Sequence, residues 1–200
     1  MDYLIKKITQ NKAEVFLKKL DMQIGKWKEI KNNSKDEYIH YHVPRDADKM
    51  YTFATYAASY LPNGKWKLFQ MDYSSSLSKD EAVFLSTLVN GKPGDVIDFN
   101  EQRSFLIEFN NNSDENNILK EILISQIIYL CLLFECHSYI VSEGSRDGEI
   151  VGVQDGFVYF IFKNKKVKKS IKDMLAQFER TPNQYCQKFQ KYLEYNSMDA

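Results

Sequence analysis

The sequence has few of the residues that mark secreted, disordered or repetitive chains. Only three cysteines, four prolines and eight glycines occur among 200 residues. An odd number of cysteines does not suit a disulfide framework, so Cys131, Cys136 and Cys186 are predicted to be reduced thiols. The first ten residues place Lys6 and Lys7 among their apolar side chains, which is not the layout of a signal peptide. We therefore expect a soluble protein of a reducing cytoplasm.

The sequence also lacks a long uncharged apolar run and an excess of either charge. Its longest apolar stretch, from Ile118 to Phe134, contains Lys120 and Glu121. A membrane span needs about 20 mostly apolar residues, so this stretch predicts a buried helix and no membrane insertion. Lys+Arg number 27 and Asp+Glu number 27. The zero net charge disfavours a protein that binds nucleic acid through a wholly basic surface.

Apolar residues make up 44% of the chain and aromatic residues 14%, enough to build a full core. No proline- or serine-rich linker divides the sequence, so a single domain over residues 1–200 is expected. Segments with a period of two alternate with segments of helical period. This order predicts an α+β fold, in which a mostly antiparallel sheet built from hairpins packs against a long central helix and C-terminal helices.

Local signals give the expected bounds of each element. The turn Leu61-Pro62-Asn63-Gly64 is expected to join two strands of a hairpin, because Asn-Gly between aromatic and β-branched runs is a strong hairpin signal. Helices are expected over residues 12–24, 78–88, 114–134 and 170–178, and from 181 onward. Strands are expected over residues 38–43, 50–60, 65–73, 95–99, 104–109, 138–142, 149–153 and 157–162.

The charges are segregated along the chain although their sum is zero. Residues 101–162 contain 10 acidic and 3 basic side chains, a net charge of −7. Residues 1–100 carry +2 and residues 163–200 carry +5. Such a segment can steer a basic partner, or its acids can simply keep exposed strand edges soluble. The candidate partner-binding residues are Glu143, Asp147, Glu149, Asp155 and Tyr73.

Tyr73 belongs to a group of tyrosines that the sequence places along the expected strands over residues 50–73, with Tyr51, Tyr56 and Tyr60. Tyrosine is favoured at interfaces because it buries a large ring and keeps a polar end. Ordinary packing between helices and sheet explains these residues equally well. The tyrosines are therefore consistent with a docking surface but do not require one.

A lysine run from Lys163 to Lys169, followed by Lys172, forms the opposite charge pole. Clustered lysines can contact phosphates, but no arginine or aromatic residue is interleaved here. The run is expected to be a solvated segment or a partner-facing patch. Nucleic-acid binding is therefore not expected from it.

His40-Tyr41-His42 is the spacing that most suggests a metal. Residues i and i+2 of a strand share a face, so both imidazoles could reach one ion. The third-ligand candidates, His137, Glu143 and Asp72, are distant in sequence. Solvent-facing or hydrogen-bonded histidines are the alternative. The sequence contains no Gly-x-Ser-x-Gly elbow, no phosphate-binding Gly-x-x-x-x-Gly-Lys motif and no calcium loop, so no catalytic residue, metal or cofactor is predicted.

These observations favour a non-catalytic protein-binding domain. The most specific hypothesis is an immunity (antitoxin-type) protein that neutralises a basic bacterial toxin, such as a nuclease, by occluding it with an acidic surface. This hypothesis is an analogy that rests on the acidic middle segment, the single-domain size and the lack of catalytic motifs, since no stretch matches a family motif. The alternative hypothesis is a small metal-binding protein or hydrolase centred on the pair His40 and His42.

Overall fold

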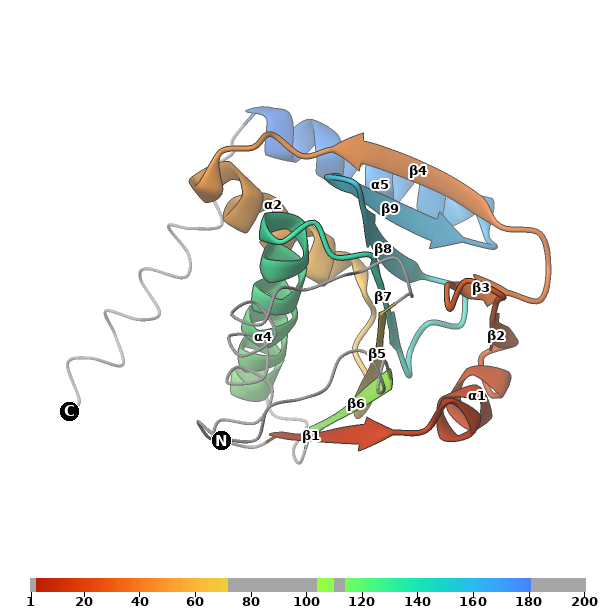
Figure 1. Ribbon diagram of the computed structural model, residues 1–200. Coiled ribbons are helices and arrows are strands. Elements are labelled where there is room, and N and C mark those ends of the chain that lie inside the picture. The colour runs from red at the N-terminus through yellow and green to blue at the C-terminus, as the bar shows by residue number, and fades with distance from the viewer. Residues whose placement is uncertain (1–2, 72–103, 110–113, 181–200) are drawn as a thin grey trace, which may run out of the picture.

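The computed structural model describes residues 3–71, 104–109 and 114–180, and for residues 114–119 it describes the backbone (Figure 1). Thirteen elements follow one another along these ranges. They are β1 (Tyr3–Ile8), α1 (Gln10–Lys18), β2 (Met22–Ile24), β3 (Ile30–Asn32), β4 (Glu37–His42), α2 (Ala47–Tyr60), β5 (Trp66–Met71), β6 (Ser104–Phe109), α4 (Asp114–Leu133), β7 (Ser138–Ser142), β8 (Ile150–Gln154), β9 (Phe157–Phe162) and α5 (Lys165–Arg180).

Seven strands form one antiparallel sheet in the order β1-β6-β5-β7-β8-β9-β4. Strands β2 and β3 form a separate antiparallel pair. The expected α+β fold with a mostly antiparallel sheet is therefore confirmed. Within the described residues, β1 and β4 are the two edges of the large sheet.

The two faces of the sheet carry different layers. Helices α2, α4 and α5 lie on one face, where their apolar side chains pack against Phe69, Ile140 and Phe160. Helix α1 and the β2–β3 pair lie on the other face, against Trp66, Leu68 and neighbouring strands. Figure 1 shows the sheet nearly edge-on between these layers. We call them the helix face and the α1 face.

The first helix is shorter than predicted. Helix α1 begins after Thr9, whose side chain accepts a hydrogen bond from the backbone N–H of Lys12, and it ends at Lys18. The predicted helix over residues 12–24 is wrong at its C-terminal end because Asp21 adopts a positive φ of 57° and turns the chain into β2. Strand β3 lies where no strand was expected.

The strand predicted over residues 50–60 is also wrong, because Ala47–Tyr60 forms helix α2. Asp46 caps this helix by accepting a hydrogen bond from the backbone N–H of Lys49. Met50, Phe53, Ala54 and neighbouring residues are buried at helical spacing. Consequently the segment 61–64 joins a helix to β5 and is not a hairpin turn.

The other expected elements within the described residues agree with the structure. Strands β5, β6, β7, β8 and β9 and helix α4 lie where the sequence predicts them, within a few residues at their ends. Helix α5 begins at Lys165, five residues before the predicted start at Ser170. Strand β1 was not predicted. The elements expected over residues 78–88, 95–99 and from 181 onward lie outside the described residues.

Helix α4 is the long apolar helix that the sequence predicted, and it packs against α2 and the sheet. Within the part of the chain that the structure describes, no helix combines the length and the apolar character required to cross a bilayer. Cys131, near the end of α4, and Cys136 are buried and carry free thiols. Cys186 lies outside the described residues.

Candidate functional site

The loop between β7 and β8, residues 143–149, holds three of the predicted partner-binding residues. Its backbone is fixed to two other segments. Asn32 of β3 donates its side-chain Nδ2 to the carbonyl of Gly148 at 3.2 Å. The backbone N–H of Lys163 donates to the carbonyl of Asp147 at 2.8 Å. Gly148 has a φ of +80°, which glycine adopts without strain. The loop is therefore held in one place by contacts distant in sequence.

The carboxylates of this loop accept hydrogen bonds from neutral donors. Glu143 accepts from the backbone N–H of Lys65 at 2.6 Å, and Glu149 accepts from the backbone N–H of Asp147 at 3.0 Å. Asp147 accepts from the side-chain amide of Asn164 at 3.1 Å. An amide N–H stabilises a carboxylate without cancelling its charge. None of these three hydrogen bonds comes from a positively charged group.

Other acids of the same segment are paired with basic groups. Glu108 binds Lys6, and Glu135 lies 2.6 Å from a guanidinium nitrogen of Arg45. Asp155 lies 2.8 Å from Nε2 of His137. It belongs to the turn after β8, whereas the β7–β8 loop precedes that strand. The structure thus brings together Glu143, Asp147 and Glu149, places Asp155 at the other end of β8, and leaves Tyr73 outside the described residues.

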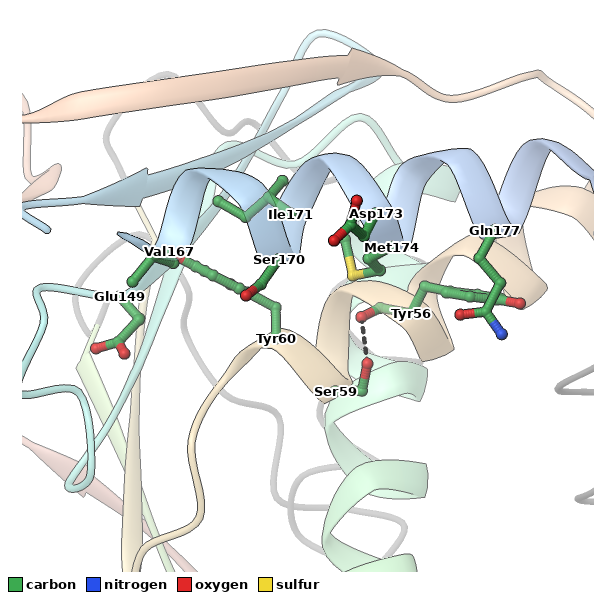
Figure 2. A pocket seen from close by; sticks show the side chains of 10 residues that line it. All are labelled: Tyr56, Ser59, Tyr60, Glu149, Val167, Ser170, Ile171, Asp173, Met174 and Gln177. Carbon is green, nitrogen blue, oxygen red and sulfur yellow. Dashed lines mark hydrogen bonds between the residues drawn. The ribbon is translucent and has the colours of Figure 1, made fainter. Parts of the chain in front are cut away.

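A groove of about 570 Å³ opens beside this loop, between helices α2 and α5 (Figure 2). Glu149 lies at one end of the groove, and the two helices form its walls. Its lining is Tyr56, Ser59, Tyr60, Glu149, Val167, Ser170, Ile171, Asp173, Met174 and Gln177.

Among the described residues, the lining contains two carboxylates, Glu149 and Asp173, and no lysine or arginine. Helix α5 nevertheless begins in the lysine run that the sequence singled out. Two of those lysines, Lys165 and Lys168, lie 3.5 and 3.9 Å from the carboxylate oxygens of Glu37 on β4. Helix α5 therefore turns acidic, polar and apolar side chains toward the groove while part of its lysine run faces β4.

The electrostatics of Glu149 favour a cation at its end of the groove. Burial raises the pKa of Glu149 above its usual range, and repulsion from Asp147 adds to the increase, while Lys163 opposes it. The ionised carboxylate is thus poorly solvated, and a second cation nearby would stabilise it.

Tyr60 also lines the groove, and its side chain is held in one position. Its hydroxyl donates to the backbone carbonyl of Ile161 at 2.9 Å. Burial raises the pKa of Tyr60, and the charges of Glu149 and Asp147 raise it further. The hydroxyl is therefore neutral at physiological pH, and the ring is held in place by its bond to β9.

The tyrosines Tyr51, Tyr56 and Tyr60 lie on helix α2, so their predicted placement along strands is wrong. Tyr56 and Tyr60 still reach a candidate site, because both line the groove. The sequence analysis missed the lining from α5. The spacing of Val167, Ile171 and Met174 signals an apolar helix face, but it does not show which helix lies opposite.

His40 and His42 share the exposed side of β4, as the sequence predicted from their spacing. Their rings lie 5.7 and 4.9 Å from the ring of Phe157. In the described ranges, no group of three His, Cys, Asp or Glu side chains could hold a metal ion. Of the third-ligand candidates, Asp72 lies outside those ranges and His137 contacts Asp155.

Lys67 on β5 is a buried cation on the helix face. It is 4% exposed, and its Nζ donates to the carbonyl of Pro62 at 3.0 Å and to Oγ of Ser142 at 3.1 Å. Burial lowers the pKa of Lys67 to about 8. A lysine beside a serine hydroxyl can activate it as a nucleophile, but Ser142 is fully buried, so a substrate cannot reach its oxygen. We assign Lys67 a structural role.

Comparisons with protein-family models, curated proteins and solved structures give no match to this chain.

Proposed function

We propose that this chain is a non-catalytic protein-binding domain that receives a basic side chain of a partner in the groove between α2 and α5. The lining of the groove carries the proposal, since its described residues include Glu149 and Asp173 but no lysine or arginine. A guanidinium or ammonium group entering the groove would form charge-assisted hydrogen bonds with these carboxylates. The rings of Tyr56 and Tyr60 add aromatic surface that suits a cation.

The neighbouring loop extends this anionic surface beyond the groove. The hydrogen bonds that Glu143 and Asp147 accept come from neutral donors. Electrostatic complementarity of this kind accelerates association with a basic surface. Within this class of function, our specific proposal is an immunity (antitoxin-type) protein that occludes a basic toxin domain such as a nuclease. The net charge of −7 over residues 101–162 and the lack of a recognised catalytic motif in the sequence support that narrower assignment by analogy with such proteins.

The test is affinity capture from a lysate of the native host, with the wild type and the double variant Glu149→Gln/Asp173→Asn compared by quantitative mass spectrometry. The wild type should retain a basic protein, and the double variant should retain at least about tenfold less of it. The reason is that hydrogen bonds to charged groups contribute more free energy than those between neutral groups. Glu179→Gln is the matched control, since this exposed carboxylate of α5 lies outside the groove lining.

Identical capture profiles for the wild type and the double variant would contradict binding through the groove. The narrower proposal is tested with the captured partner after purification. An immunity protein should abolish the partner's toxic activity, measured as nuclease turnover or growth arrest, at equal molar amounts. Tight binding that leaves that activity unchanged would reject the immunity role while retaining the groove as a binding site.

A further inference from the structure

The α1 face of the sheet presents a group of aromatic and imidazole rings near the β4 edge. Strand register places His40 opposite Tyr159 and His42 opposite Phe157. Tyr38, two residues before His40, lies on the same side of β4. Tyr38 is 62% exposed, and both histidines are exposed. We call these five residues, Tyr38, His40, His42, Phe157 and Tyr159, the aromatic face.

The rings of this face form a continuous set of contacts. Ring centroids lie 6.3 Å apart between Tyr38 and Tyr159, 6.0 Å between His40 and Tyr159, and 4.9 Å between His42 and Phe157. Phe157 and Tyr159 are themselves 6.3 Å apart. These side chains therefore form one surface across two strands.

The aromatic face continues inward over Gly152 of β8. A Cβ built on Gly152 would lie 3.2 Å from two ring carbons of Tyr139 and 3.5 Å from Cβ of Tyr159. The missing side chain lets the Tyr139 ring lie close to the backbone at this point. The surface is thereby extended toward β7, where Tyr139 is half-buried against the layer formed by α1, β2 and β3.

Among the described residues, the positions of β4, β9 and β8 on this part of the α1 face carry no carboxylate. The register places Ile150, Gly152 and Gln154 of β8 opposite the residues of β9 that share the face with Tyr159. None of these positions, nor any of the five ring positions, is acidic. A negatively charged ligand would therefore meet no repelling charge from the strands β4, β9 and β8.

The turn between β2 and β3 beside this face carries lysines and another exposed ring. Residues 26–37 contain Lys26, Lys28, Lys31 and Lys35 against Glu29, Asp36 and Glu37, a net charge of +1, and Lys31 lies 3.7 Å from Glu29. Trp27 is 68% exposed, and Nζ of Lys26 lies 5.3 Å from its ring centroid. Ile30 of β3 belongs to the same apolar cluster as Ile150, with Ile161 packed against it. This segment therefore lies on the same side of the sheet as the aromatic face.

We propose that the aromatic face and the β2–β3 pair together bind single-stranded nucleic acid. Unpaired bases stack on aromatic and imidazole rings with little sequence preference, while lysines along the path contact the phosphates. The proposal rests on different residues from the lysine run of α5, two of whose members are paired with Glu37. It is also independent of the groove, which lies on the helix face.

The test measures fluorescence anisotropy of a fluorescein-labelled 12-mer of oligo(U) with the full chain at 50 mM salt. The double variant Tyr38→Ala/Tyr159→Ala should weaken binding at least about tenfold, since each base loses its stacking partner. Tyr38→Phe should retain affinity because it keeps the ring. Leu4→Ala is the control, since Leu4 is 50% exposed on β1 at the opposite edge of the same sheet. Circular dichroism checks that each variant is folded.

Salt titration and a duplex probe separate stacking from simple charge attraction. Replacing Lys26, Lys31 and Lys35 with Gln should reduce the slope of log K against log salt by about 0.7 for each phosphate that these lysines neutralise. Three results would overturn the proposal. They are absence of binding at 100 µM protein, equal affinity for a 12-base-pair RNA duplex, and affinity that survives the tyrosine double variant but disappears when Lys165, Lys166 and Lys169 become Gln.

Discussion

Strand β9 contributes to both faces of the sheet, and its two sets of side chains differ sharply in their surroundings. Val158, Phe160 and Phe162 point to the helix face and are fully buried. Phe157 and Tyr159 alternate with them and remain partly exposed on the other face. Three helices cover the first set, whereas the layer of α1, β2 and β3 stops short of the second. The comparison indicates that the helix face stabilises the fold, whereas the aromatic face is only partly covered by the described residues and is the surface for which we propose recognition.

The largest expected effect comes from the helix face. Phe53 of α2 is fully buried, with ring centroids 4.8 Å from Tyr41, 5.0 Å from Phe178 and 6.3 Å from Phe160. Phe53→Ala leaves a cavity between α2, α5 and the sheet. We expect it to lower the free energy of unfolding by about 3–5 kcal/mol, measured by urea denaturation.

Phe157→Ala provides the matched change on the other face. Its ring is partly exposed and contacts mainly His40, His42 and Tyr159. We expect a loss below about 1.5 kcal/mol, as for a single aromatic pair. Equal losses for Phe53→Ala and Phe157→Ala would break the distinction between a stabilising face and a recognition face.

The pH dependence of the free energy of unfolding shows whether the helix face excludes water around Lys67. Since burial lowers the pKa of Lys67 to about 8, the unfolded chain binds more protons than the folded chain between that value and the ordinary lysine pKa. Stability must therefore rise with pH across this window. Between pH 8 and 9.5 the free energy of unfolding should increase by up to about 2 kcal/mol, since one pKa unit corresponds to about 1.4 kcal/mol. Urea denaturation at several pH values measures this slope.

Lys67→Met should remove that slope, because it replaces the titrating ammonium with an apolar side chain of similar length. Lys12→Met is the control, since Lys12 is exposed on α1, and it should retain the slope of the wild type. A wild-type stability that is flat or falling between pH 8 and 9.5 would show that water reaches Nζ of Lys67 and that this part of the helix face is not sealed.

The sequence predicted the sheet better than it predicted the first two helices. The run Phe157–Phe162 identified β9 with its observed bounds, because it consists of aromatic and β-branched residues and follows the turn residues Asp155 and Gly156. Residues 50–60 were mistaken for a strand because Tyr51, Thr52, Phe53 and Thr55 have high β-propensity. Burial against α4 and α5 overrides that propensity, and the cap at Asp46 fixes where the helix begins.

The candidate site was predicted only in part, because its walls are far apart in sequence. The acids at residues 143–149 were identified from the net negative charge of residues 101–162 and from their position at an expected turn, and the structure places all three in the β7–β8 loop. The groove needs Tyr60 of α2 and Asp173 of α5 on opposite walls, and no local pattern reports that pairing. The aromatic face was missed for a similar reason, since it depends on the register between β4 and β9.

The smallest expected effect concerns Glu149, which lies at the rim between the sealed helix face and solvent. Because burial raises its pKa, the folded chain binds more protons than the unfolded chain just above the ordinary carboxyl range. The stability contributed by this group therefore falls as pH rises through that window.

Glu149→Gln keeps an oxygen that can accept from the backbone N–H of Asp147, so it should raise the free energy of unfolding at pH 7 by roughly 0.5 kcal/mol. The gain should shrink toward zero as pH falls below the ordinary carboxyl pKa, in paired thermal melts at pH 7 and pH 4. A variant that is less stable than the wild type at pH 7 would mean that the ionised carboxylate stabilises the fold. Glu149 would then not be the poorly solvated anion that the proposed binding of a partner's cation requires.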